Sequence, residues 1–372
     1  FESATGPMPI GLYLVRETAA PASVTDRTAP FLVTLPFPTG SLGSPANEWI
    51  YDVHLYPKNS VTELVKSRVV PAPGSVEARN PDLVRWAIRA GIPTLAGGGS
   101  ISEFAVTDQL PTGMQFVPTP PSGVAGTSVI VRNASGVVQN FAAPADYTLT
   151  TTGNTTTATF TPAGRTRLAS AALADGQVEL NVLTRATTTP ADGQLVNTAS
   201  ATVNGSTETV SAVTPIGEFT LLAYAPTGSG GKTPLAGAVY QLFLSESDAN
   251  AGTNPISVGG VDRWTTNAEG IAYVTGLTPA TYWGREIEPP AGFQPPRLTT
   301  PAQVVAGTTS TTAPIRNYLE VPHTQLPPWA LPLTGGDGAL WFGVGGGALV
   351  MIAVGAAIVV ARRRRVEAVP AV

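Results

Sequence analysis

Between residues 61 and 213 the chain alternates short runs of Val, Thr, Ile and Leu with clusters of turn-forming residues. This is the periodicity of strands that bury one face, with hairpin turns between them. We therefore predict an antiparallel β-sandwich over these residues. The runs that carry the pattern are SVIVRNASG, YTLTTTGNTTTATF, QVELNVLTRA and NTASATVNGSTETV.

Residues 216–319 repeat this pattern, and residues 321–330 depart from it. The first range contains IGEFTLLAYA, AGAVYQLFLS, DRWTTNAEGIAYVTGL, ATYWGREIE and TTAPIRNYL, which predict a second all-β unit. The second range holds three prolines, and we predict an extended spacer there.

The C-terminal segment predicts a membrane helix. Residues 339–361 carry no charge over 23 positions, and four consecutive arginines follow at 362–365. At about 1.5 Å per residue, a helix of that length spans a hydrocarbon core of about 30 Å. The arginines would act as a stop-transfer signal, with the C-terminus in the cytoplasm and the rest of the chain outside. The alternative is a buried core helix, but such a helix would not stay apolar on all sides and end in four arginines.

Two segments of the chain repeat each other. Residues 11–22 (GLYLVRETAAPA) and 280–291 (ATYWGREIEPPA) align without a gap, with Tyr, Arg, Glu, Pro and Ala at matching positions. Their separation of 269 residues is too large for a solenoid and suits duplicated domains. Only 10 residues precede the first copy, and the chain begins at Phe1 without a signal segment, so we expect the first domain to be truncated.

Composition narrows the possible chemistry. The 372 residues include 39 Gly, 35 Pro and no Cys, with 43% hydrophobic and 12% charged residues, which is not the profile of a disordered chain. A net charge of −4 gives no reason to expect a nucleic-acid partner. With two distant histidines and no Cys, we expect no zinc site, no His-centred triad, no cofactor and no enzyme activity. Lysine is scarce, 3 against 18 Arg; a general bias explains the ratio, but not the positions Lys58, Lys66 and Lys232.

The segment before the apolar span completes a three-part signal. Its residues are Leu331, Pro332, Leu333, Thr334 and Gly335. Together with the span and the basic end, this LPxTG pentapeptide resembles the sorting signal of Gram-positive surface proteins. The resemblance implies that a sortase cysteine attacks the carbonyl of Thr334, releases the chain from Gly335 onward, and passes the acyl group to an amine.

Further resemblances cover nearly the whole chain. LAGAVYQLFL, TTNAEGIAYVTGLTPATYWGREIEPPAGF and IRN look like a B-type repeat domain of Gram-positive surface proteins. WAIRAGIP, FAVTDQLPTGMQF and LVNTASATV look like a fimbrial isopeptide-forming domain over residues 66–203, and residues 1–60 look like the end of a pilin N-terminal domain.

The fold class that these resemblances imply is all-β. We expect tandem immunoglobulin-like (collagen-adhesin-type) β-sandwich domains and one C-terminal transmembrane helix. The expected parts are a truncated pilin N-terminal domain (1–60), an isopeptide-forming sandwich (61–213), a prealbumin-like B-type sandwich (214–320), a Pro-rich spacer (321–330) and the sorting signal (331–372).

Residues 49–58 resemble the pilin motif, WxxxVxVYPK, with Leu55 in place of the second Val. The resemblance implies that the motif lysine attacks the sortase acyl intermediate of the next subunit, which would join Lys58 of one copy to Thr334 of another. An ammonium is not a nucleophile, so this lysine must lose its proton and be reachable at a domain edge. The alternative is an ordinary surface lysine after a strand. The matching positions are Trp49, Val53, Tyr56, Pro57 and Lys58.

Lys66, Asp108 and Asn197 match a second kind of site, an intramolecular Lys–Asn isopeptide bond. Burial would make the amine neutral, a protonated carboxyl would polarise the Asn carbonyl, and ammonia would leave. The bond would brace the first and last strands of a domain that has no cysteine. In the alternative reading, Lys66 is a snorkelling edge residue, Asp108 a turn former and Asn197 a polar group at a strand end. Glu103 is an alternative carboxyl.

The second β-unit departs from its family. Glu286 and Asn317 stand at the acid and Asn positions, but Ala223 falls where the reactive lysine is expected. Lys232 lies in the loop GSGGK, which is poorly placed to replace it and lacks the context of a phosphate-binding loop. We therefore predict no isopeptide bond in residues 216–319.

These observations predict a pilus shaft subunit that a sortase polymerises and attaches to the cell wall, supporting adhesion. The expected partners are a sortase, identical pilin subunits, peptidoglycan and host surface ligands, and the expected location is the cell surface. The alternative is a singly wall-anchored adhesin or an accessory pilus subunit, which would not need Lys58.

Overall fold

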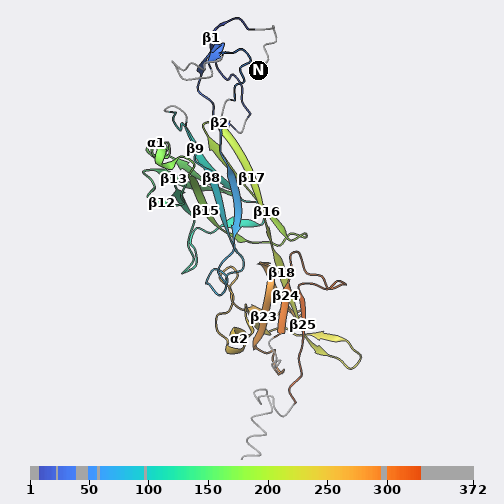
Figure 1. Ribbon diagram of the computed structural model, residues 1–372. Helices are drawn as coiled ribbons and strands as arrows, with labels where there is room; N and C mark the ends of the chain where they lie inside the picture. Colours follow the sequence, from blue (N-terminus) through green and yellow to red (C-terminus); the bar gives the residue numbers. More distant parts are fainter. Residues whose placement is uncertain are drawn as a thin grey trace, which may run out of the picture.

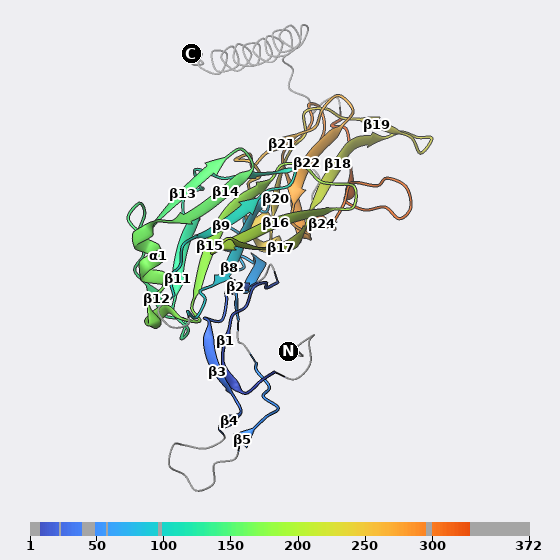
Figure 2. The same cartoon turned by 90° about the horizontal axis from the view of Figure 1, so that it is seen from above.

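The computed structural model describes residues 8–21, 24–38, 49–56, 59–95, 99–294 and 300–327. Within these ranges the chain is almost entirely β, in three groups of strands that follow one another along the molecule (Figures 1 and 2). No helix in them is long and apolar enough to cross a membrane. The span expected at 339–361, the arginines after it and the pentapeptide at 331–335 lie outside the described residues.

The N-terminal region (residues 8–61) is built from three small antiparallel strand pairs. Its β1–β3 pair alternates exposed and half-buried side chains apart from Val33, which is the one buried hydrophobic residue among those described here. Large apolar side chains are therefore exposed here, including Leu12, Leu14 and Leu32. The pairs are β1 (Gly11–Val15) with β3 (Phe31–Leu35), β4 (Phe37–Pro38) with β5 (Trp49–Ile50), and β2 (Val24–Asp26) with β6 (Ser60–Val61).

The middle sandwich (residues 64–215) packs a six-stranded sheet against a five-stranded sheet. The first sheet has the order β12-β11-β15-β8-β7, with β10 pairing with β15. Its strands are β7 (Leu64–Val69), β8 (Leu83–Gly91), β10 (Met114–Phe116), β11 (Ser128–Arg132), β12 (Val138–Gln139) and β15 (Gln177–Ala186). The second has the order β13-β14-β9-β16-β17, with β9 (Phe104–Gln109), β13 (Tyr147–Thr152), β14 (Thr155–Phe160), β16 (Gln194–Val203) and β17 (Ser206–Pro215).

One core fills this sandwich, because the strands of both sheets turn every second side chain inward. Trp86 and Leu180 enter it from the first sheet, and Phe104 and Ala199 from the second. The short helix α1 (Pro162–Leu168) lies at its flank (Figure 2), and a 3₁₀ turn (Ala171–Leu173) follows α1 in the chain.

The third sandwich (residues 217–322) consists of two four-stranded sheets around a core of its own. In one sheet β18 (Gly217–Pro226) pairs with β19 (Lys232–Pro234), β22 (Ile271–Leu277) and, in parallel, β25 (Tyr318–Pro322). The other has the order β21-β20-β23-β24, with β20 (Val239–Phe243), β21 (Trp264–Thr265), β23 (Ala280–Glu288) and β24 (Thr300–Val304). A short helix, α2 (Glu246–Ala251), follows β20.

The middle and third sandwiches are joined by more than the chain between β17 and β18. The amide of Ser257 donates to the carbonyl of Arg79, and the amide of Thr278 donates to the carbonyl of Pro81. Asp82 is fully buried at this junction, where its carboxylate accepts from the amide of Gly259 and pairs with Arg185 at 2.6 Å. These contacts fix the loop before β8 against the third sandwich.

Candidate cross-linking sites

Lys66, Asp108 and Asn197 meet inside the middle sandwich, although they come from three strands in two sheets. Lys66 is on β7 of the first sheet, and Asp108 and Asn197 are on β9 and β16 of the second. Each occupies an inward position of an alternating strand, where an apolar residue is the rule. Asn197 is thus inside a strand, and β16 is the last strand but one of this sandwich.

The Asp108 carboxylate bridges the other two side chains. Lys66 Nζ forms an ion pair with Asp108 Oδ1, and the side chains of both residues are 0% exposed. Asn197 Nδ2 donates to Asp108 Oδ2 at 3.3 Å, while Asn197 Oδ1 is buried with no hydrogen-bond partner. Glu103 is exposed, and Asp108 is the carboxyl that contacts both Lys66 and Asn197.

Burial shifts both charged groups toward their neutral forms. It lowers the pKa of Lys66, and the neighbouring Asp108 carboxylate opposes that shift. It also raises the pKa of Asp108, against the opposing effects of Lys66 and Asn197. A proton transfer from Lys66 to Asp108 is therefore easier here than in water, and it would leave a neutral amine on the carboxyl group that Asn197 also contacts.

Sequence reasoning missed one aromatic neighbour of this site. Lys66 Nζ lies 5.1 Å from the ring centroid of Trp86, which is 0% exposed. Trp86 is on β8, opposite Arg68, and therefore diagonal to Lys66 on the same inner face.

The third sandwich buries a different set of groups. Glu286 on β23 pairs with His323, Oε1 to Nε2 at 2.7 Å, and the two side chains are 1% and 0% exposed. His323 Nδ1 lies 3.1 Å from the carbonyl oxygen of Val321, and the hydroxyl of Tyr240 lies 3.4 Å from Nε2. Burial and the nearby Glu286 carboxylate raise the pKa of Tyr240, so its hydroxyl keeps its proton.

The residues singled out in the third sandwich have other partners than an isopeptide site would need. Ala223 is fully buried and lies opposite Val321 on β25. Asn317 has a φ of 55°, and its side-chain amide bonds to the backbone of Val305 and Gly307. Lys232 pairs with Glu320 at 2.5 Å at the surface.

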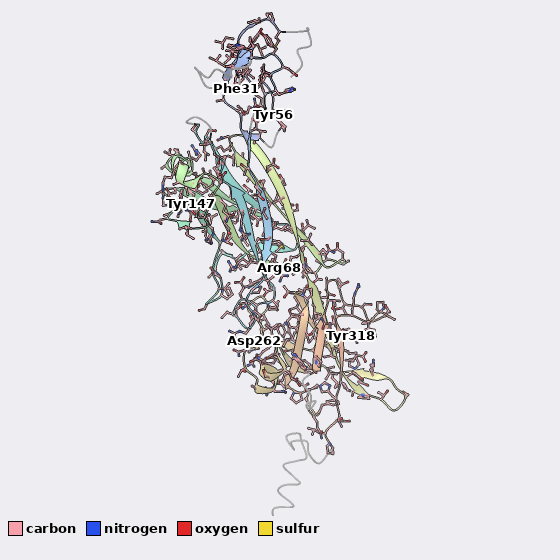
Figure 3. All side chains as sticks on the ribbon, viewed as in Figure 1. Phe31, Tyr56, Arg68, Tyr147, Asp262 and Tyr318 are labelled. Atoms are coloured by element: carbon pink, nitrogen blue, oxygen red, sulfur yellow. The ribbon has the colours of Figure 1, made fainter. Side chains whose placement is uncertain are left out.

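The described part of the pilin motif is well exposed. Trp49 on β5 is 59% exposed and Tyr56 is 84% exposed, while Val53 is half-buried. Figure 3 places Tyr56 where the N-terminal region meets the middle sandwich. Pro57 and Lys58 lie outside the described residues.

The chain is anchored directly after the motif. Asn59 Nδ2 donates to Glu17 Oε1 at 2.9 Å, and Asn59 Oδ1 accepts from the amide of Thr28 at 3.0 Å. Glu17 belongs to the first copy of the internal repeat, at the position that Glu286 holds in the second. The sequence singled out that glutamate pair, but not Asn59.

Metal binding finds no support in the described ranges, where no group of three or more His, Cys, Asp or Glu side chains is placed to hold an ion. His54 stands beside Asp52 at the surface, at 3.4 Å, and His323 is committed to Glu286.

Comparison with known proteins adds two family matches. Residues 5–60 match the Gram-positive pilin subunit D1, N-terminal domain, and residues 222–318 match the SpaA prealbumin-like fold domain. The chain is 27% identical to the fimbrial subunit type 2 of Actinomyces naeslundii, over 96% of this chain and 71% of that protein.

Two solved structures share the fold. The full-length major pilin SpaD of Corynebacterium diphtheriae is 22% identical with a TM-score of 0.60, covering 86% of this chain and 77% of that one. The major pilin SpaA of the same species is 19% identical with a TM-score of 0.51, covering 85% and 81%. These likenesses establish an all-β, multi-domain pilin fold with prealbumin-like and immunoglobulin-like domains. With the family matches and the fimbrial relative, they show that the chain is similar to Gram-positive pilin subunits along nearly its whole length.

Proposed function

We propose that a sortase polymerises this pilin through an isopeptide bond between Lys58 of one copy and Thr334 of the next. The sortase thiolate attacks the Thr334 carbonyl, the peptide bond to Gly335 breaks, and the amine of Gly335 leaves. The neutral amine of Lys58 then attacks the thioester, and the enzyme thiol is released. Each step replaces one acyl bond by another, so no cofactor is needed.

The observation that carries this proposal is the state of the other two lysines. Lys66 is buried in an ion pair, and Lys232 is held by Glu320. Lys58 follows the exposed Tyr56 and precedes Asn59, which Glu17 and Thr28 anchor. A fixed backbone directly after a lysine would help to hold its amine in place at the sortase.

An immunoblot of cell-wall extracts boiled in detergent tests the polymerisation. The native chain is expected to give a ladder of high-mass species, and Lys58→Ala a single band. Lys232→Ala is the matched control, since it removes another surface lysine and should leave the ladder intact. A single band from the native chain would favour a singly wall-anchored adhesin or an accessory subunit, and a ladder from Lys58→Ala would mean that another amine is used.

The attachment to the cell surface is part of the same proposal. The apolar residues 339–361 and the four arginines hold the precursor in the membrane until the sortase cuts after Thr334. The last subunit of a shaft is then transferred to peptidoglycan, and the finished pilus supports adhesion to host ligands.

A second cross-link is proposed within each subunit, between Lys66 and Asn197. The proton of Lys66 passes to Asp108, and the amine attacks Cγ of Asn197. The Cγ–Nδ2 bond breaks, the departing NH2 group takes up the proton that the attacking amine loses and leaves as ammonia, and Asp108 keeps the proton that it received. The shared burial of the three side chains supports this chemistry, and the related pilin SpaA is one whose assembly is described with stabilising isopeptide bonds.

The mass of the purified chain tests the internal bond. The native chain is expected to be lighter than its sequence by one ammonia, and Asn197→Ala to have the full mass of its sequence. A native chain of full mass would reject the internal bond and leave the pilus assignment untouched.

A further inference from the structure

The amine of Lys66 is held in place by more than its ion pair. Its Nζ lies over the face of the Trp86 indole, 5.1 Å from the ring centroid. The negative face of an indole attracts an ammonium, most strongly where water is absent. Both side chains are fully buried, so water does not compete for this contact.

The indole is itself fixed by a short relay of hydrogen bonds. Trp86 Nε1 donates to Thr184 Oγ1 at 3.2 Å, and Thr184 Oγ1 donates to the carbonyl of Val84 at 2.7 Å. Thr184 lies on β15, opposite Val84 on β8, and is 0% exposed. A buried hydroxyl among apolar side chains is costly unless it is hydrogen-bonded. The Thr184 hydroxyl is hydrogen-bonded to the indole and to the backbone of β8, the strand that carries Trp86.

Such restraint matters for a lysine that must react. A lysine side chain has several rotatable bonds and usually extends along an apolar surface until its charge reaches water. Formation of a bond to Asn197 requires that the nitrogen stays close to Cγ after it has given up its proton and its attraction to Asp108. A second contact that restrains the amine is then needed, and the indole, with its centroid 5.1 Å from Nζ, supplies one.

We propose that Trp86, oriented by Thr184, is the positioning residue for the Lys66–Asn197 cross-link. This inference rests on the internal bond proposed above. The ring holds the ammonium over Asp108 before proton transfer and confines the neutral amine afterward. It takes no part in the bonds that form and break.

A time course of bond formation tests this role. The full chain is made by cell-free synthesis, samples are quenched in acidic denaturant, and the fraction that has lost one ammonia is read by intact mass. We expect Trp86→Leu, which removes the ring, to slow bond formation by roughly tenfold or more, and Trp86→Phe, which keeps a ring face, to restore most of the rate. Thr184→Val, which frees the indole, should slow it by about threefold.

Packing effects are separated in a background that cannot react. Each substitution is repeated with Lys66→Met, and the unfolding temperature of the middle sandwich is measured. Thr184→Val should slow the bond in the reactive chain and leave the Lys66→Met chain folded at the temperature of the time course. The folding check is that Trp86→Leu stays folded when combined with Lys66→Met. If it does, the proposal is overturned when Trp86→Leu alone forms the bond at the native rate, or when Trp86→Phe forms it as slowly as Trp86→Leu. A native chain that never loses ammonia would instead reject the internal bond itself.

Discussion

The middle and third sandwiches each contain a buried carboxyl group with close polar partners, but the partners differ. In the middle sandwich Asp108 meets the amine of Lys66 and the amide of Asn197. In the third sandwich Glu286 meets the imidazole of His323, with the hydroxyl of Tyr240 close by. An amine and an amide can combine with loss of ammonia, whereas an imidazole and a phenol beside a carboxylate have no comparable reaction. With the bond proposed above, the partners of the buried acid decide whether a strand is tied covalently or by hydrogen bonds.

In the third sandwich, the hydrogen bonds of His323 fix where the imidazole carries its protons. The carbonyl of Val321 only accepts, so His323 Nδ1 must donate to it, and Nε2 then faces the Glu286 carboxylate. One proton must lie between Nε2 and Oε1, and it ties the chain after β25 to β23 across the two sheets. This link joins the same kind of elements as the proposed bond between β7 and β16, without a covalent bond.

Lys66→Met gives the largest effect that this comparison predicts. The proposed bond closes a loop of about 130 residues, and in the chain-entropy model a cross-link over that length contributes roughly 5 kcal/mol. Denaturant unfolding of the middle sandwich should show a loss of that order. Lys232→Met is the matched control and should change little, because its ion pair is exposed. An unchanged stability in Lys66→Met would argue against a covalent brace.

His323→Leu is expected to cost the third sandwich about 3 kcal/mol, because it leaves the buried Glu286 carboxylate without its partner. Glu286→Gln should cost only about 1 kcal/mol, since an amide can still donate to Nε2. Both losses should appear in the unfolding of the third sandwich and not in that of the middle one. Equal losses of unfolding free energy in the two variants would mean that leaving the Glu286 carboxylate unpaired costs no more than replacing it by an amide.

The pH dependence of the middle sandwich should reveal the buried Asp108 once the bond is prevented. Burial raises the pKa of Asp108, whereas an unfolded Asp titrates near about 3.9. Between these two values the folded chain holds a proton that the unfolded chain has released. The contribution of Asp108 to the free energy of unfolding is therefore fully present below about pH 3.9. It falls as the pH rises toward the pKa of the folded chain, by up to about 1.4 kcal/mol per pH unit.

The check uses Lys66→Met with and without Asp108→Asn, unfolded by denaturant from pH 4 to 7. Only the chain that keeps Asp108 should show the decline. Parallel pH profiles would contradict the burial of a titrating carboxyl at this site.

The smallest predicted effects come from a matched pair of helix caps. Thr161 Oγ1 accepts from the amide of Gly164 at the start of α1, and Ser245 Oγ accepts from the amide of Asp248 at the start of α2, both at 3.1 Å. Thr161→Ala and Ser245→Ala should each cost about 1 kcal/mol. Each should lower only the transition of its own sandwich in calorimetry, and a loss shared by both would show that the two sandwiches unfold together.

Much of the fold was accessible from the sequence because strands that bury one face repeat with a period of two. The run LVNTASATV, for example, became β16 with Leu195, Ala199 and Ala201 turned inward. The all-β pilin assignment followed from such runs and from the motifs, and the comparisons confirm it. The domain boundaries, the membrane helix and the sorting signal stay predictions.

The partners of the buried groups were harder to foresee. Glu286 and His323 are 37 residues apart, and Trp86 and Thr184 are 98 apart, so no local pattern links them. The resemblance directed attention to Asn317, but that residue has a positive φ, and its side-chain amide donates to backbone carbonyls of the loop after β24. The rarity of histidine could have drawn attention to His323, one of only two in the chain, which stands directly after a strand. Its partner, however, depends on which strands pack together.

The most direct test of the account is a mass-spectrometric analysis of pili purified from the cell wall and digested with protease. We predict a branched peptide in which the side-chain nitrogen of Lys58 is joined to the carboxyl carbon of Thr334. If Lys58 is found only with a free amine while Thr334 is always joined to peptidoglycan, the chain is not polymerised through this lysine, and the central claim is wrong.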